Sequence, residues 1–142
     1  MPMAAVTDLV PVRHMSVARG TLRIPSGVAA SFSADQLAEA RTAAVVACKD
    51  AARLLPSAPP FQLTDCFCDI TQADPNAAAG SPPSWEATVS CVGYARATLE
   101  TATLLGVAAA LASLWDAAKH ADPAATAGMR ITDLHVVQNV EG

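Results

Sequence analysis

The sequence LETATLLGVAAALASLWDAAKHA, residues 99–121, is dominated by Ala, Leu and Val and decides the fold that we expect. It predicts an apolar helix, with Thr98 as its N-cap and Glu100 near its positive end. Asp116 and Lys119 lie three residues apart in the last turns, which places both side chains on one helix face. Such a pair is either a solvated ion pair or part of an active site.

The segments on either side of this helix alternate between helix and strand patterns. Residues 33–55 predict a second helix, because Ser33 and Gln36 have capping-box spacing and Pro56 ends the apolar stripe. A loop rich in Pro and Gly at residues 72–84 separates two strands that we expect to form a hairpin. The expected strands span residues 18–25, 61–71, 85–95 and 129–140.

The expected order, β-α-β-β-α-β, is the split βαβ pattern of the ferredoxin-like fold. We therefore expect one α+β domain over residues 1–142, with a four-stranded antiparallel sheet and two helices on one face. The other sheet face needs a cover, and only 15% of the residues are charged. The chain is therefore predicted to be a homo-oligomer that buries this face between subunits.

Composition also argues against several classes of partner. The net charge is −4 and the nine Lys and Arg residues are scattered, so we expect no nucleic-acid partner. The N-terminal residues lack a signal-peptide pattern, and the apolar run at residues 104–115 is short for a membrane span. We expect a cytoplasmic protein with no membrane partner.

Four cysteines raise the question of a metal site. Cys66 and Cys68 would share one face of a strand, but no second pair has zinc-ligand spacing. Buried thiols explain this pattern better than ligands do, so we expect no metal and no cofactor.

Four segments, taken together in this order, resemble the cyclic pyranopterin monophosphate synthase family, the molybdenum cofactor biosynthesis protein C family. They are ARGTLRI, AAVVACKDAARLLPSAPPFQL, YARATLETATLLGVAAALASLWDAAKHA and MRITDLHVVQNVEG. Asp116 and Lys119 match the Asp-x-x-Lys motif of the family, and Glu100 matches the first acid of its Glu pair. The resemblance implies that these three residues are catalytic, and it suggests dimers combined into a hexamer.

The sequence departs from the family pattern at the other site positions. The second Glu falls on Ala102, the His of Cys-His-Pro falls on Pro59, and a loop Lys falls near Ser33. The tail lysines of the family are absent from QNVEG. The family substrate is a cyclised guanosine triphosphate, and a polyphosphate needs several Lys or Arg donors. These losses predict that the nucleotide is no longer the substrate.

The best interpretation of the sequence is a repurposed lyase, cyclase or isomerase that acts on a small, weakly charged substrate in a secondary-metabolite pathway. Lys119 can serve as acid, base or Schiff-base amine, and Asp116 can orient it. We expect Trp115, Pro59, Arg19 and Tyr94 to contact the substrate. Two alternatives remain open, a non-catalytic binding or scaffold subunit and a genuine cyclic pyranopterin monophosphate synthase.

Overall fold

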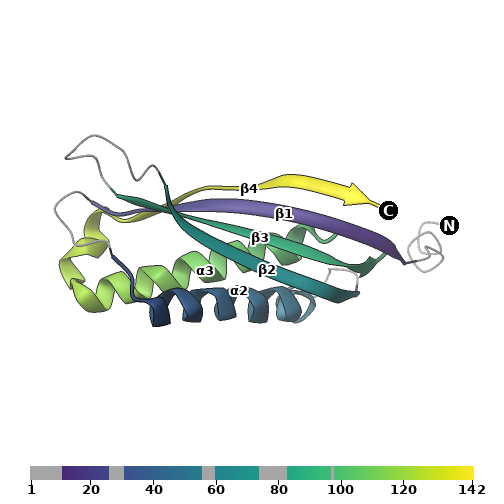
Figure 1. Cartoon of the computed structure of the whole chain (residues 1–142), viewed down its shortest axis with the longest axis horizontal. Coiled ribbons are helices and arrows are strands. Elements are labelled where there is room, and N and C mark those ends of the chain that lie inside the picture. The colour runs from purple at the N-terminus through teal and green to yellow at the C-terminus, as the bar shows by residue number, and fades with distance from the viewer. Residues whose placement is uncertain (1–10, 26–30, 56–59, 74–82, 97) are drawn as a thin grey trace.

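The computed structural model describes residues 11–25, 31–55, 60–73, 83–96 and 98–142. Its elements follow the order β1 (Val12–Arg23), α2 (Ala34–Leu54), β2 (Phe61–Ala73), β3 (Ser84–Ala95), α3 (Glu100–Ala121), η1 (Pro123–Gly128) and β4 (Arg130–Glu141). The strands form one antiparallel sheet in the order β2-β3-β1-β4. The helices α2 and α3 lie side by side under one face of this sheet (Figure 1). The predicted ferredoxin-like α+β fold is confirmed.

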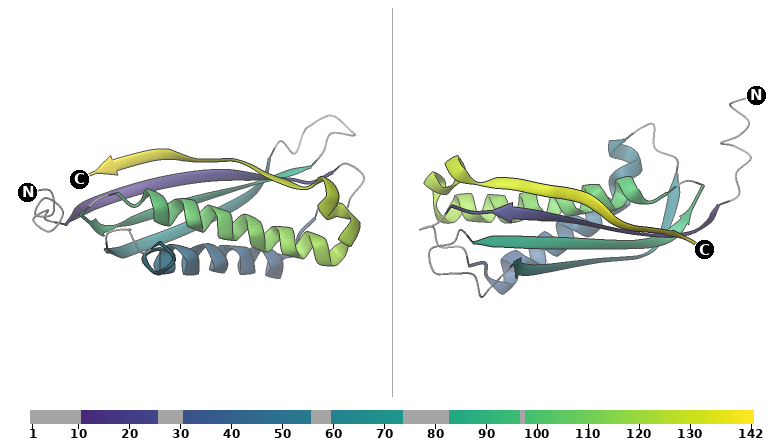
Figure 2. Two further views of the ribbon diagram at one scale, coloured as in Figure 1. Left: turned by 180° about the vertical axis from the view of Figure 1, so that it is seen from behind. Right: turned by 90° about the horizontal axis from the view of Figure 1, so that it is seen from above.

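Among the described elements, both helices lie on one side of the sheet and none covers its opposite face, as the view from above shows (Figure 2). Residues that alternate with the buried ones project from this face, and they include exposed apolar side chains. Phe67 is 62% exposed and Tyr94 is 46% exposed. The sheet therefore has one face sealed by helices and one that is partly apolar and open in the single chain.

Helix α2 begins as its sequence predicts. The Ser33 hydroxyl accepts a hydrogen bond from the Gln36 backbone N–H at 3.1 Å, and the Gln36 side chain accepts one from the Ser33 N–H at 2.9 Å. This reciprocal pair is the predicted capping box. Four small residues on one stripe, Ala40, Ala44, Cys48 and Ala51, are fully buried. Their size lets α2 pack closely against α3 and the sheet.

Helix α3 begins differently from its prediction, which named Thr98 as the cap. The N-cap residue is Leu99, and no side-chain cap hydrogen bond is present at this end. Leu99 is fully buried. The Thr103 hydroxyl lies within hydrogen-bond distance of two backbone carbonyl oxygens of the first turn. Its Oγ1 atom is 3.2 Å from Leu99 O and 2.9 Å from Glu100 O. Burial of Leu99 in the core therefore fixes the start of α3.

Strand β1 begins at Val12, six residues before the predicted start. The prediction missed this part because the residues that face the helices there, His14 and Ser16, are polar. They alternate with Met15 and Val17, which lie on the open face, so the hydrophobic pattern is inverted relative to the rest of the strand. All the other strand ends lie within two residues of their predicted positions.

Helix α3 has 22 residues and, by length and hydropathy alone, could span a membrane. The shorter range considered in the sequence, residues 104–115, underestimated it. However, 44% of its most apolar 18-residue window is buried within the molecule. Its buried residues pack against the sheet and α2, with Val107, Leu111 and Leu114 fully enclosed. These contacts give α3 the role of a central core helix.

Candidate functional site

The charged pair at the end of α3 is exposed in the single chain. The Asp116 side chain is 66% exposed, and Lys119 is also exposed. Asp116 Oδ2 lies 3.9 Å from His120 Nδ1, and this nitrogen is 2.7 Å from the Asp116 carbonyl oxygen. Within the described residues, no ion pair joins Asp116 to Lys119. The expectation that Lys119 is partly desolvated is therefore wrong for one chain alone.

Trp115 precedes this pair and is partly buried against the hydrophobic core. Its position next to Asp116 keeps it at the same end of α3 as the charged pair. The ring therefore belongs mainly to the core, and its exposed part can form one apolar wall beside the pair.

Glu100 lies at the opposite end of α3. Sixteen residues separate it from Asp116, which corresponds to about 24 Å along a helix. Its Oε1 accepts a hydrogen bond from Asn139 Nδ2 of β4 at 2.9 Å. The sequence grouped Glu100 with Asp116 and Lys119, but one chain cannot bring all three to one substrate atom. A shared site needs a second copy of the chain.

A buried polar cluster lies near Glu100, and the sequence analysis did not anticipate it. Ser16 Oγ and Thr103 Oγ1 are 3.1 Å apart and both residues are fully buried. His14 is also buried, and its Nε2 has no hydrogen-bond partner within the described part of the chain. The signal was the alternation of His14 and Ser16 with apolar residues, at the same parity as the buried Ala18.

Two positions that depart from the family pattern have different outcomes. Ala102 is fully buried, so this position offers no polar group to a substrate. Pro59, expected to contact the substrate, lies outside the described residues. The described site therefore retains Glu100 but has no second acid at the matching position.

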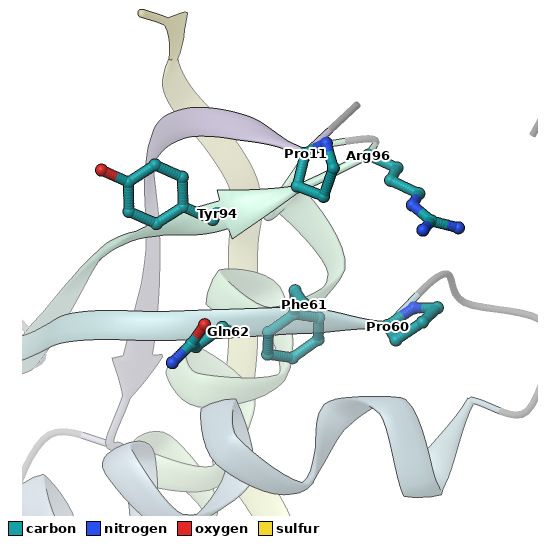
Figure 3. A pocket seen from close by; sticks show the side chains of 6 residues that line it. All are labelled: Pro11, Pro60, Phe61, Gln62, Tyr94 and Arg96. Carbon is teal, nitrogen blue, oxygen red and sulfur yellow. The ribbon is translucent and has the colours of Figure 1, made fainter. Parts of the chain in front are cut away.

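Arg19 of β1 and Tyr94 of β3 lie on the open sheet face, which is the face opposite α3. Arg19 Nε is 3.4 Å from Glu86 Oε1 and 3.3 Å from Thr88 Oγ1, so a neighbouring carboxylate already partners its charge. Tyr94 lines a surface hollow of about 260 Å³ (Figure 3). The hollow is also lined by Pro11, Pro60, Phe61, Gln62 and Arg96. Tyr94 is thus beside a cavity, whereas Arg19 is engaged in a cross-strand ion pair.

Three of the four cysteines converge between α2 and the hairpin of β2 and β3. The sulfur atoms of Cys48, Cys66 and Cys91 all lie within 4.8 Å of one another. The Cys91 thiol donates a hydrogen bond to Cys66 Sγ at 3.7 Å. Cys66 and Cys68 share the inward face of β2, as expected, but Cys68 is not part of this group.

The thiols of this group differ in pKa, because their surroundings shift the pKa of Cys66 and that of Cys91 in opposite directions. Hydrogen bonds from Cys48 and Cys91, together with the charge of Lys49, lower the pKa of the Cys66 thiol. Hydrogen bonds with Cys48 and Cys66, together with burial, raise the pKa of Cys91. Burial raises the pKa of Cys68 to about 11. Within this group, Cys66 is therefore the thiol whose thiolate form its surroundings favour.

The structural neighbours of the chain are distant. The crystal structure of AtUAH in complex with glyoxylate matches with a TM-score of 0.39 and 8% identity, over 93% of this chain and 29% of that one. A hydantoinase/carbamoylase family amidase from Burkholderia ambifaria matches with a TM-score of 0.34 and 10% identity, over 94% and 30% of the two chains. Likeness at this level supports no conclusion about the site.

Sequence relatives are more informative. A protein of Methanosphaerula palustris described as "Probable cyclic pyranopterin monophosphate synthase" is 28% identical over 149 residues, covering 99% of this chain and 92% of that protein. The profile of the MoaC family matches residues 3–142. Because this match covers nearly the whole sequence and agrees with the observed fold, the chain belongs to the MoaC family.

Proposed function

We propose that this MoaC family chain is a lyase, cyclase or isomerase that acts on a small, weakly charged substrate instead of a cyclised guanosine triphosphate. One observation carries the proposal. The helix that holds Asp116 and Lys119 has a fully buried alanine, Ala102, where the family pattern has its second Glu. The missing acid removes a catalytic group of the family pattern, and a site that also lacks the loop and tail lysines of the family is poorly equipped to bind a polyphosphate.

The surroundings of the pair support the same conclusion. The cationic side chains of the last turn of α3 are Lys119 and His120. His120 already contacts Asp116, which leaves Lys119 as the principal donor for an anionic group. Recognition of a triphosphate ordinarily uses several such donors at once. A neutral or singly charged substrate fits this donor set better.

The chemistry of the pair follows from its composition. The Lys119 amine can exchange a proton with a substrate or form a Schiff base with a carbonyl group. Asp116 lies on the same helix face and can orient the ammonium group or accept a proton from the substrate. Both roles gain strength when a neighbouring subunit excludes water from this helix end.

The proposed active unit is therefore a homo-oligomer, in dimers that combine into a hexamer. Exposed apolar side chains on the open sheet face support this part, with Phe67 and Tyr94 as the largest. Light scattering at micromolar concentration tests it. A mass near 14.5 kDa, the mass of one chain, would contradict the oligomer.

Substrate choice is tested by calorimetry and by a turnover assay with the cyclised nucleotide. We expect neither micromolar affinity nor conversion. Tight binding with conversion would establish a genuine cyclic pyranopterin monophosphate synthase, the activity named for the Methanosphaerula palustris relative.

The second candidate is a binding or scaffold subunit without catalysis. The exposure of Asp116 and Lys119 in the single chain favours it, because an acid–base pair usually works in a site protected from water. A ligand-bound structure of the oligomer separates the two candidates. Lys119 within hydrogen-bond distance of the ligand supports the enzyme, whereas Lys119 in bulk solvent supports the binding subunit.

A further inference from the structure

The sulfur cluster of Cys48, Cys66 and Cys91 lies in the interior, away from the charged ends of α3. Cys66 and Cys91 face each other across β2 and β3 as paired residues, and Cys48 approaches them from α2. All three sulfurs lie within 4.8 Å of one another, and the Cys66–Cys91 pair is at 3.7 Å. Three elements far apart in sequence thus present one sulfur atom each to a common point.

Helix α3 closes the inner side of the cluster. A Cβ atom at Gly106 would lie 2.5 Å from Cys48 Sγ, a contact that requires the sulfur to move. Gly106 therefore leaves room for the sulfur where it stands. Cys48 and Cys91 are fully buried, so their positions are held by packing on every side.

The outer side of the cluster is open through Cys66. This half-buried residue lines a surface hollow of about 270 Å³ together with Val45, Lys49, Leu63, Thr64 and Asp65. A small ion can reach Cys66 from solvent by this route without unfolding the core. The cluster thus combines fixed ligands on the inside with an entry on the outside.

The distances suit a metal with three sulfur ligands. A metal–sulfur bond of about 2.3 Å places the sulfurs of a trigonal site about 4 Å apart. The observed separations bracket this value, so small rotations of the side chains are sufficient. Within the described residues, the candidate ligand group contains no His or carboxylate.

This ligand set discriminates among metals. Thiolates select soft ions, monovalent copper and zinc above all. Zinc in proteins is almost always four-coordinate, and a fourth ligand here would have to be a water molecule from the hollow. We propose that Cys48, Cys66 and Cys91 form a binding site for a thiophilic d10 ion, with monovalent copper preferred to zinc.

The test uses the reduced full-length chain under anaerobic conditions. Monovalent copper is titrated against a chromophoric copper chelator, and zinc is titrated separately. We expect one copper ion per chain, a sulfur-to-copper charge-transfer band in the near ultraviolet, and three sulfur neighbours at about 2.3 Å by X-ray absorption. Binding no tighter than that of a chain without these thiols, or zinc binding tighter than copper, would overturn the proposal.

Variants provide the matched comparison. Cys66→Ser and Cys91→Ser should lower copper affinity at least about a hundredfold, because loss of a ligand costs more than loss of its supporting contacts. Cys68→Ser is the control, since Cys68 is buried on the same face of β2 as Cys66 but lies outside the cluster. Circular dichroism of each variant verifies the fold. Equal copper affinity in all three variants would show that the sulfurs serve only as core packing.

Discussion

The two ends of α3 differ in how the rest of the molecule uses them. At the N-terminal end, Glu100 is bound by Asn139, and Thr103 shares a buried hydrogen bond with Ser16. At the C-terminal end, Asp116 and Lys119 are exposed to solvent, and within the described part of the chain the Asp116 carboxylate contacts His120. Side chains at the N-terminal end of α3 therefore bind other parts of the same chain, whereas those at the C-terminal end are exposed and can contact a substrate or another subunit.

This difference changes what a mutation at each end should do. A group held by buried hydrogen bonds contributes to stability, and its removal leaves a partner unsatisfied. An exposed charge contributes little to stability, so its removal reveals function with little disturbance of the fold. Four experiments separate effects on activity from effects on stability, in order from the largest expected effect to the smallest.

The largest effect is expected on activity at the exposed end. Lys119→Met and Asp116→Asn should each lower kcat/KM for the native substrate by about a hundredfold or more, the scale of a lost general acid or base. Arg53→Met is the matched control, because Arg53 is an exposed cation in the last turn of α2. Steady-state kinetics provide the measurement. Full activity in both variants would make the pair a helix-end charge cluster without catalytic function.

A smaller effect is expected on the free energy of unfolding at alkaline pH, because the Cys68 thiol is buried in the core. Burial raises the pKa of Cys68 from 9.0 to about 11, so the folded state holds this proton more tightly than the unfolded state. Its contribution, about 3 kcal/mol for two pKa units, is complete below pH 9.0 and is lost as the pH rises towards 11. Denaturant titrations at several pH values measure the loss. Cys68→Ala should show a shallower decline, and an identical decline would contradict the assignment.

The buried end should respond to loss of one hydroxyl. Thr103→Val keeps the shape of the side chain but leaves Ser16 without its 3.1 Å partner. We expect a decrease of about 1–2 kcal/mol in the free energy of unfolding. The double variant Ser16→Ala with Thr103→Val removes both groups and should recover part of the loss. No recovery would show that the cost arises from packing instead of the unsatisfied hydroxyl.

The smallest effect is expected on stability at the exposed charges. Lys119→Met and Asp116→Asn should each change the free energy of unfolding by less than about 0.5 kcal/mol. Both side chains are exposed in the single chain, so their charges contribute little to its stability. Denaturant midpoints of the two variants at pH 7 measure this. A large loss for Lys119→Met would indicate that the helix end is buried in an oligomer.

Local sequence patterns determined most of the fold. The capping box at Ser33, the apolar stripes of both helices and the alternating strands are short-range signals, and each was recovered within a few residues. The start of β1 was missed because His14 and Ser16 place polar groups on the buried face. The packing of α3 supplies Thr103 as a hydrogen-bond partner for the buried Ser16, a long-range contact that no local pattern reports.

The sequence by itself also determined which charges end α3, because spacing along one helix fixes which side chains share a face. Only the tertiary structure decided that Glu100 lies about 24 Å from Asp116 and that Asn139 engages it. Likewise, three cysteines separated in sequence became one cluster only when α2 packed on the β2–β3 hairpin. The physical reason is common to both cases. Periodicity reports which face a residue occupies, whereas the partner on that face comes from another segment, which only chain packing selects.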